Sequence, residues 1–228
     1  MCDSFRHPAL LAKMAATLDV ISEGRLELGI GWGSAPAELG IYGISDDTPS
    51  QRSSRLAEGL TILEAMFTGE RFDHDGEFFH LAGAVGRPRP VSGRVPVHIG
   101  GAGPTLTMPL VARHADWWNC PSYAIDERRQ RQRLSGSARV SVQRPIGLAV
   151  TDSDAEEVTA LATHRLGRWG GLVTGTADQV ADVLCRDAAE GVEGFVLTFH
   201  DFGQEATLRH FMAEVAPRVR DDASLVIE

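Results

Sequence analysis

The sequence predicts an α/β protein in which helices cover a parallel sheet, either open or closed into a barrel. Branched apolar stretches alternate with stretches of helical periodicity along the 228 residues, as in successive β-α units. Two of the predicted strands end in glycine turns, at Gly31 and at Gly100. Because ligands of parallel α/β folds bind at the carboxyl ends of strands, the two turns predict a pocket at one edge of the sheet.

The first third of the chain predicts a helix, a strand and a second helix. Pro8 suits the first turn of a helix, and alanines and leucines continue it. Residues 25–31 predict a strand that runs into the first glycine turn, and a long loop follows. Residues 51–68 predict the second helix, because leucines recur there at helical spacing. A hairpin is then expected to turn at Asp75-Gly76.

A second glycine turn, residues 100–104, follows a branched run at 95–99 that predicts a buried strand. Glycines let a ligand approach the backbone closely, and Pro104 fits the first turn of a helix predicted over 105–114. The amino terminus of a helix favours an anion such as phosphate. A plain strand-to-helix connection explains the same glycines, so this stretch alone leaves both interpretations open. Pro109 is expected to kink that helix.

The second half of the chain predicts further alternation of helices and strands. The predicted helices are 125–134, 154–165, 176–190 and 208–219, and the predicted strands are 145–150 and 195–199. Thr176 is the expected amino-terminal cap of its helix. In the short run 115–119, Asp116 is expected to hold Arg113 or a backbone N–H, with Trp117 in the core and Trp118 at the rim.

Composition excludes several classes of function. The net charge of −9 argues against a nucleic-acid interface, and the one basic cluster, residues 128–133, has the polarity of a solvated helix face. The cysteines at 2, 120 and 185 lack the spacing of a zinc site or a disulfide framework. No apolar run is long enough for a membrane span. We therefore expect a cytoplasmic protein with no metal, no nucleic-acid partner and no membrane association.

With these elements placed, a series of motifs resembles the bacterial luciferase-like flavin and deazaflavin oxidoreductases. The matching stretches are residues 6–13 (RHPALLAK), 17–31 (TLDVISEGRLELGIG), 52–58, 75–81, 88–90, 99–103 (IGGAG), 112–119 (ARHADWWN), 175–180 (GTADQV) and 191–197 (GVEGFVL). Each motif is modest alone, but their order and spacing cover nearly the whole chain.

The resemblance implies a luciferase-like (β/α)8 TIM barrel and a single domain over residues 1–228. In this chain the barrel is incomplete, because members of the family carry two β/α units and a third strand before the Arg6-His7-Pro8 helix. The resemblance also implies an oxidoreductase or monooxygenase. It would transfer hydride to, or oxygenate, a small organic substrate. The Ser4-to-Pro8 and 31–34 motifs look closest to users of coenzyme F420, with FMN as the alternative.

Site residues follow from the same resemblance, and the catalytic acid or base stays unknown. The residues implied to bind the cofactor are Ser4, Gly31, Gly33, Gly100, Gly101, Gly103 and Pro104. Trp32 and Glu38 are implied for the substrate pocket, although Trp32 equally fits packing under the loop, and a loop carboxylate such as Glu38 is more often solvated. His7 is expected to order the turn before its helix rather than to act as an acid or base.

Two alternatives to the enzyme stay open: a non-catalytic relative, and a fragment that cannot fold alone. The absent amino-terminal strands favour a non-catalytic, cofactor-binding or degenerate truncated relative, whose mark would be binding without turnover. A homodimer is a further expectation, because members of the resembled family often dimerise through early helices.

Overall fold

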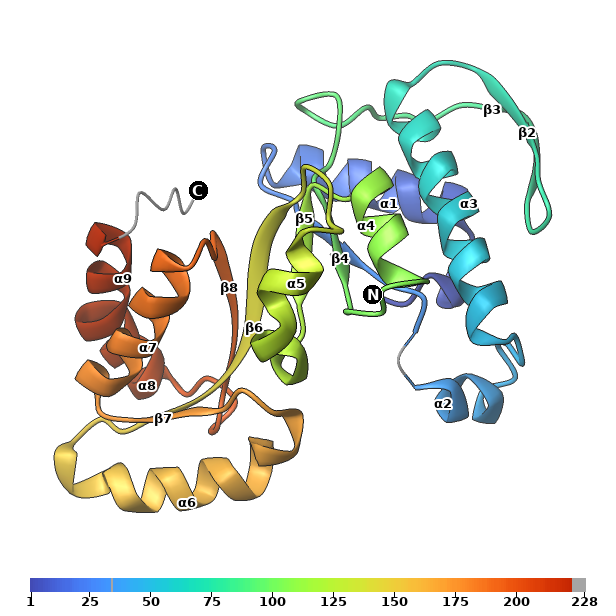
Figure 1. Cartoon of the computed structure of the whole chain (residues 1–228). Coiled ribbons are helices and arrows are strands. Elements are labelled where there is room, and N and C mark those ends of the chain that lie inside the picture. The colour runs from blue at the N-terminus through green and yellow to red at the C-terminus, as the bar shows by residue number, and fades with distance from the viewer. Residues whose placement is uncertain (34, 223–228) are drawn as a thin grey trace. The chain divides into compact units, whose positions relative to one another are not determined.

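Strands and helices alternate along the computed structural model, which describes residues 1–33 and 35–222 (Figure 1). Contacts divide the chain into two units. The first unit holds residues 1–117 with 134–138, and the second holds residues 118–133 with the chain from 139 onward. Each unit is described separately below. No helix in the described part of the chain is long and apolar enough to cross a membrane.

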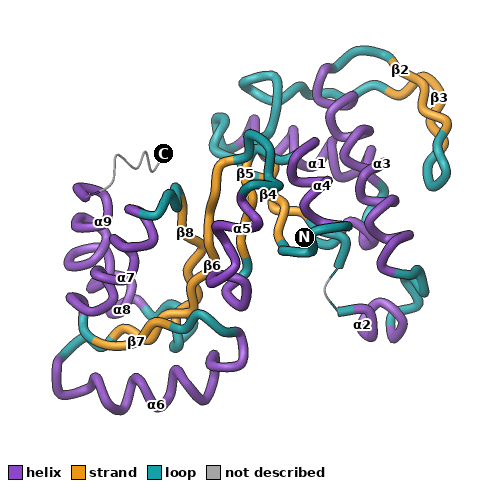
Figure 2. The backbone as a smooth tube through the Cα atoms, viewed as in Figure 1, coloured by secondary structure: helices purple, strands orange, loops and turns teal. Residues whose placement is uncertain are grey.

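The first unit is built on two parallel strands, β1 (Leu28–Ile30) and β4 (Val97–Gly100). Their register places Leu28 opposite Val97 and Ile30 opposite Ile99, and all four of these side chains are buried. Helices α1 (Pro8–Ile21) and α3 (Pro49–Thr68) pack against each other (Figure 2). Helix α3 begins with a capping box between Thr48 and Gln51, which satisfies amino-terminal N–H groups.

The loop between β1 and α3 contains a short helix that the sequence did not predict, α2 (Pro36–Ile41). The hairpin pairs β2 (Phe72–Asp75) with β3 (His80–Ala84). Glu58 of α3 holds this hairpin by accepting hydrogen bonds from the backbone N–H groups of Phe78 (3.0 Å) and Phe79 (2.8 Å). Its carboxylate also contacts His74 Nε2 at 2.9 Å. Burial opposes ionisation of Glu58, but these hydrogen bonds outweigh it and lower the pKa of the carboxyl.

The helix after β4 begins later than the sequence predicts. Residues 104–106 form a turn, and α4 (Thr107–His114) starts where the N–H groups of Thr107 and Met108 donate to the Gly103 carbonyl, both at 3.0 Å. Pro109 therefore lies in the first turn, where a missing N–H leaves no helix hydrogen bond unmade. The predicted kink at Pro109 is wrong for this reason.

The second unit has β6 (Arg139–Leu148) as its central strand, with β7 (Val173–Gly175) and β8 (Gly194–Phe199) parallel to it. The short β5 (Trp117–Cys120) spans the point in the sequence where the second unit begins. Trp118 is completely buried, so its predicted place at the rim is wrong. Three of the four residues of β5 are buried, as expected for a strand covered on both faces.

Helices cover both faces of the second unit's sheet. They are α5 (Arg128–Gln132), α6 (Ala155–Leu166), α7 (Ala177–Ala189), α8 (Glu205–His210) and α9 (Ala216–Asp222), with a π-helical turn at 211–215. Ile146 and Leu148 of β6 join a core with residues of α7 and α9. Gly147 faces the other way, where a Cβ would lie 2.6 Å from the Cβ of Ala162 in α6. Figure 1 shows α6 on one side of β7 and α7 on the other.

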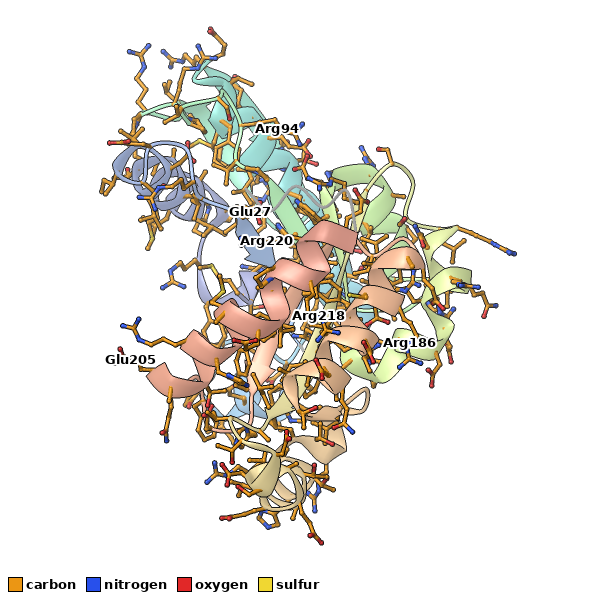
Figure 3. All side chains as sticks on the ribbon, turned by 90° about the vertical axis from the view of Figure 1, so that its left-hand side faces the viewer. Glu27, Arg94, Arg186, Glu205, Arg218 and Arg220 are labelled. Carbon is orange, nitrogen blue, oxygen red and sulfur yellow. The ribbon has the colours of Figure 1, made fainter. Side chains whose placement is uncertain are left out.

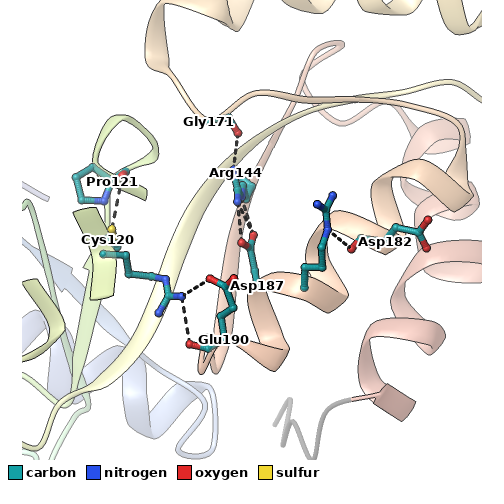
Figure 4. A network of polar contacts seen from close by, with 9 residues as sticks. Cys120, Pro121, Arg144, Gly171, Asp182, Asp187 and Glu190 are labelled. Atoms are coloured by element: carbon teal, nitrogen blue, oxygen red, sulfur yellow. Dashed lines mark hydrogen bonds and ion pairs between the residues drawn. The ribbon is translucent and has the colours of Figure 1, made fainter. Parts of the chain in front are cut away.

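Buried charges of the second unit are paired (Figure 4). Arg144 Nε and Nη2 donate to the two carboxylate oxygens of Asp187, both at 2.8 Å, and Nη1 donates to the Gly171 carbonyl at 3.0 Å. Arg128 is only 2% exposed and donates to the carbonyl and the carboxylate of Glu190, both at 3.2 Å. The prediction that residues 128–133 form a solvated face is therefore wrong at Arg128. Burial raises the pKa of the nearby Cys120 thiol to about 12.

Ion pairs at the surface connect the last helix, α9, to α7. Arg218 of α9 lies against α7, where it pairs with Asp178 and Asp182 (Figure 3). Thr176 and Gln179 form a capping box at the start of α7, so the predicted cap is confirmed.

Candidate functional site

The end of β1 lies beside the amino-terminal segment of the chain. The Gly31 N–H donates to the Met1 carbonyl at 2.9 Å, and the Asp3 N–H donates to the Gly31 carbonyl at 3.1 Å. Cys2 and Gly31 thus form a parallel bridge next to the strand. This pairing fixes Asp3 and Ser4, which belong to a single 3-10 turn (Asp3–Phe5), beside the first glycine turn.

Asp3 is a buried carboxyl that is only partly satisfied. Its side chain belongs to a residue that is 6% exposed, and Oδ1 has no hydrogen-bond partner among the described residues. The hydroxyl of Ser4 is also buried without a partner in that part of the chain. Burial raises the pKa of Asp3 to about 6, although the guanidinium of Arg55 and donors of Ser4 act in the opposite direction. Burial, which favours the protonated carboxyl, is therefore set against Arg55 and the Ser4 donors, which favour the ionised form.

Gly31 and Gly33 differ in what surrounds them. A Cβ on Gly31 would meet no heavy atom within 4 Å, apart from those of its chain neighbours, among the described residues. Gly33 has φ +87°, and a Cβ there would lie 3.0 Å from the Sγ of Cys2. Local geometry alone therefore requires glycine at Gly33. No such requirement exists at Gly31, where the space in front of the strand end is open.

The second glycine turn packs around the side chain of Thr107. Gly101 has φ +117°, and a Cβ there would lie 3.0 Å from the Cγ2 of Thr107. A Cβ on Gly103 would make an ordinary contact with the Thr107 hydroxyl, at 3.4 Å. Pro104 lies in the turn before α4, and Gly100 is the exposed last residue of β4. Turn geometry therefore explains Gly101, which was one of the two interpretations of this stretch.

Trp32 connects the two glycine turns. Its Nε1 donates to the Thr107 hydroxyl at 3.4 Å, and the guanidinium carbon of Arg52 lies 5.3 Å from its ring centroid. Trp32 is half-buried and lies between the end of β1 and the turn before α4. Glu38 is not part of this group, because it is exposed on α2. Ser34, which completes the 31–34 motif, lies outside the described residues.

The sequence did not point to three residues of this site, which are Arg52, Arg55 and Thr107. Arg52 is 5% exposed and its Nη1 donates to the Asp47 carbonyl at 3.0 Å. Arg55 lies over the Phe79 ring, 4.6 Å from its centroid. The Nε atoms of both arginines are buried without a partner within the described ranges. One signal was present in the sequence: both charges share the helical face of α3 that Leu56 and the other buried leucines occupy.

Two polar residues outside the cluster have structural roles. His7 caps α1, because its Nδ1 accepts from the Ala9 N–H at 3.3 Å, and the expected turn-ordering role is confirmed. Asp116 accepts from the Val97 N–H at 2.9 Å and pairs with Arg94. The predicted backbone partner is therefore right, and the charged partner is Arg94 instead of Arg113.

Comparison with known proteins gives the family. A family model described as luciferase-like monooxygenase matches residues 3–193. An uncharacterised protein of Mycobacterium tuberculosis is 31% identical over 191 residues, which is 82% of this chain and 64% of that protein. This chain therefore spans less than two thirds of that relative's length.

Two further similarities concern proteins with named cofactors. The F420-dependent glucose-6-phosphate dehydrogenase of Microbacterium testaceum is 36% identical over 101 residues, which is 44% of this chain and 30% of that protein. A type II Baeyer–Villiger monooxygenase of Pseudomonas putida, solved in complex with FMN, aligns with a TM-score of 0.76 at 19% identity. The alignment covers 96% of this chain and 78% of that structure. These likenesses confirm the predicted luciferase-like barrel fold, of which this chain matches a part.

Proposed function

Because this chain belongs to the luciferase-like monooxygenase family, we propose that it binds coenzyme F420, or alternatively FMN, in front of the end of β1. It would use that cofactor in the oxidoreduction of a small organic substrate. The cofactor supplies the redox chemistry, while the protein binds it, orients it and excludes water.

The open space at Gly31 carries this proposal. Glycine at a strand end allows a flat ring to approach the backbone, and no local contact of the described residues demands glycine there. The backbone of the 3-10 turn lies beside the same strand end, where the Asp3 N–H donates to the Gly31 carbonyl at 3.1 Å.

Each residue of the site then has a distinct task. Gly31 leaves room for the ring, Ser4 donates a hydrogen bond to it, and Trp32 bounds the pocket between the two turns. Gly33, at φ +87°, gives the backbone after the strand a left-handed conformation that glycine adopts without strain. The turn at Gly100, Gly101, Gly103 and Pro104 would lie near the cofactor phosphate, and Glu38 would reach a hydroxyl of the substrate or cofactor.

Coenzyme F420 is the first choice because the stronger sequence match is to a protein named for it. Identity is 36% over 101 residues to the F420-dependent dehydrogenase, whereas the solved F420-dependent and FMN-bound neighbours are equally remote, at 18% and 19%. With a deazaflavin, the reaction would be hydride transfer to or from the substrate. With FMN, oxygenation would be the expected alternative.

Fluorescence titration of purified protein with coenzyme F420 and with FMN tests the proposal. Gly31→Val places a branched side chain in the ring's space, and we expect it to weaken binding at least ~10-fold, which is ~1.4 kcal/mol. Gly29→Val is the matched control, because Gly29 lies on the same strand with equally open surroundings. It should bind like the wild type.

If neither cofactor binds the wild type, the proposal is wrong. If Gly31→Val and Gly29→Val have the same effect, the site lies elsewhere. Binding without turnover of any tested alcohol, aldehyde or ketone would favour the non-catalytic alternative instead.

A further inference from the structure

We propose that the substrate binds on the sheet face of the first unit that carries Gly29 and His98, and that Nδ1 of His98 accepts a hydrogen bond from a hydroxyl group of that molecule. This inference deepens the proposed function and rests on it, because it names a substrate class, an uncharged alcohol. His98 lies outside the residues assigned above to the cofactor.

The face in question lacks side chains at two successive positions of β1. Alternate residues of a strand point to the same face, so Gly29 and Gly31 lie opposite the buried side chains of Leu28 and Ile30. Gly29 is exposed, and a Cβ there would meet no heavy atom within 4 Å, apart from those of its chain neighbours, among the described residues. Open space therefore lies at both glycines, which are ~7 Å apart along the strand.

His98 borders the space at Gly29. The register of β1 and β4 places His98 directly opposite Gly29, and paired residues of neighbouring strands share a face. The ring of Trp117, in the same unit, stacks on the imidazole with a centroid distance of 5.3 Å and an interplanar angle of 9°. On the β1 side, Gly29 has no side chain to cover the ring. The His98 side chain is 15% exposed, so a small molecule can reach it.

A contact with Glu27 determines which ring nitrogen is free. His98 Nε2 lies 2.7 Å from Glu27 Oε2. A carboxylate only accepts hydrogen bonds, so the bonded Nε2 carries a hydrogen, and Nδ1 is the acceptor of the neutral ring. Nδ1 has no partner within the described ranges and is not fully buried. It is therefore available to a hydroxyl group on the open face.

An uncharged alcohol fits these groups better than an anion does. Glu27 directly precedes β1 and its side chain is 54% exposed, so it places a carboxylate beside Nδ1. A phosphate or carboxylate would be repelled by that charge, whereas a hydroxyl can donate to either acceptor. The ammonium of Met1 donates to the Gly29 carbonyl at 2.8 Å. Because strand carbonyls lie in the plane of the sheet, this cation is at the strand edge.

Acylation by diethyl pyrocarbonate, read for each histidine by peptide mass spectrometry, tests the placement of His98. Wild type and Gly29→Val are each treated in the presence of saturating cofactor. We expect His98 to be modified in the wild type and to lose most of its modification in Gly29→Val, because valine fills the space beside the ring. His80, whose side chain is 70% exposed, should react equally in both proteins, and His114, 3% exposed, should react in neither.

An NMR titration of the wild type tests the ligand class and needs no variant. The probes are cyclohexanol and its charged analogues cyclohexylammonium and cyclohexanecarboxylate, and the readout is the Cε1–H signal of His98 in protein saturated with coenzyme F420 or FMN. We expect cyclohexanol to shift this signal saturably and to bind at least ~10-fold more tightly than the carboxylate, which Glu27 repels.

If the cofactor binds while His98 resists acylation, or while cyclohexanol leaves its signal unshifted, this inference is overturned and the proposed function stands. Equal acylation of His98 in wild type and Gly29→Val would likewise remove it from the face beside Gly29. Tighter binding of either charged analogue would overturn the assigned substrate class. Absence of cofactor binding would overturn the proposed function, and this inference with it.

Discussion

Two buried polar clusters, one in each unit, contrast in how completely they are bonded. All three nitrogens of the Arg144 guanidinium donate hydrogen bonds, two to the carboxylate of Asp187 and one to the Gly171 carbonyl. Around Asp3, the carboxyl Oδ1 and the Ser4 hydroxyl have no partner in the described chain. A saturated cluster has no capacity left for a ligand, whereas an unsaturated one is stable only if something else completes it. The two clusters therefore differ in how completely their buried polar atoms are bonded.

Charge follows the same division. The two carboxylate oxygens of Asp187 accept bidentate hydrogen bonds from Arg144, the strongest geometry of an ion pair. At Asp3, burial is the largest influence and raises the pKa, outweighing the attraction of Arg55 and the donors of Ser4 and of the Asp3 backbone. The second unit therefore pairs its buried carboxylate with a guanidinium, while folding makes the Asp3 carboxyl of the first unit harder to ionise.

Breaking the saturated cluster should have the largest effect. Asp187→Ala leaves the Arg144 guanidinium buried with only the Gly171 carbonyl, and we expect a loss of ~3–5 kcal/mol in the free energy of unfolding. Urea denaturation measures it. The double variant Arg144→Met, Asp187→Leu should recover most of that loss, because no unpaired charge remains. A loss below ~1 kcal/mol for Asp187→Ala would show that the two clusters do not differ as described.

Removing the charge at Asp3 should instead raise the free energy of unfolding. Because folding raises its pKa from 3.8 to about 6, the folded state holds a proton between those values that the unfolded state releases. The wild type therefore loses stability as pH rises from ~4 to ~6, by up to ~3 kcal/mol for a shift of about two units. Asp3→Asn should be more stable than wild type by that amount at pH ~7 and equal to it near pH ~3. Equal stabilities at both pH values would refute the raised pKa.

Glu58 provides a fully bonded carboxylate within the first unit, because it accepts from two backbone N–H groups and contacts His74. Glu58→Gln replaces an acceptor by an NH2 group that faces the N–H donors of Phe78 and Phe79, and we expect a loss of ~2 kcal/mol at pH ~7. Since the pKa of Glu58 is lowered on folding, this contribution is present above pH ~4.5 and disappears as pH falls below it. Thermal unfolding at pH ~3 and ~7 checks both parts, and a loss that persists at low pH would contradict the assignment.

The smallest difference is expected between two glycines of one turn. Gly33→Ala should cost ~1–2 kcal/mol, because φ is +87° and Cys2 lies close. Gly31→Ala should change the free energy of unfolding by less than ~0.5 kcal/mol, since its surroundings are open. Chemical denaturation of both variants compares them. Equal losses would mean that Gly31 is required by the fold, and the argument for a ligand there would fail.

Local chemistry predicted the parts of the fold that depend on neighbouring residues. The proline start of α1, the cap at Thr176 and the last strand all rest on a few adjacent side chains. Prediction failed where the burial of a side chain depends on residues that are distant in the sequence. Arg128 is buried because Glu190, 62 positions away, provides its acceptors. The Asp3 cluster escaped notice for the same reason, since Arg55 reaches it from another helix.

Sequence motifs predicted that the two glycine turns lie close together, but not what surrounds each glycine. The two glycine turns are connected through Trp32 and Thr107, so their predicted proximity is confirmed. Which glycines a ligand needs, and which the backbone needs, could not be separated without knowing what lies beside each missing Cβ.

The most direct test of a ligand site at the unsaturated cluster is an amide NMR titration of the whole chain with coenzyme F420 and with FMN. We predict that saturating cofactor shifts the amide signals of Asp3, Ser4, Gly31 and Thr107, while those of Arg144 and Asp187 stay unchanged. Shifts confined to the second unit, or no shifts with either cofactor, would contradict the account.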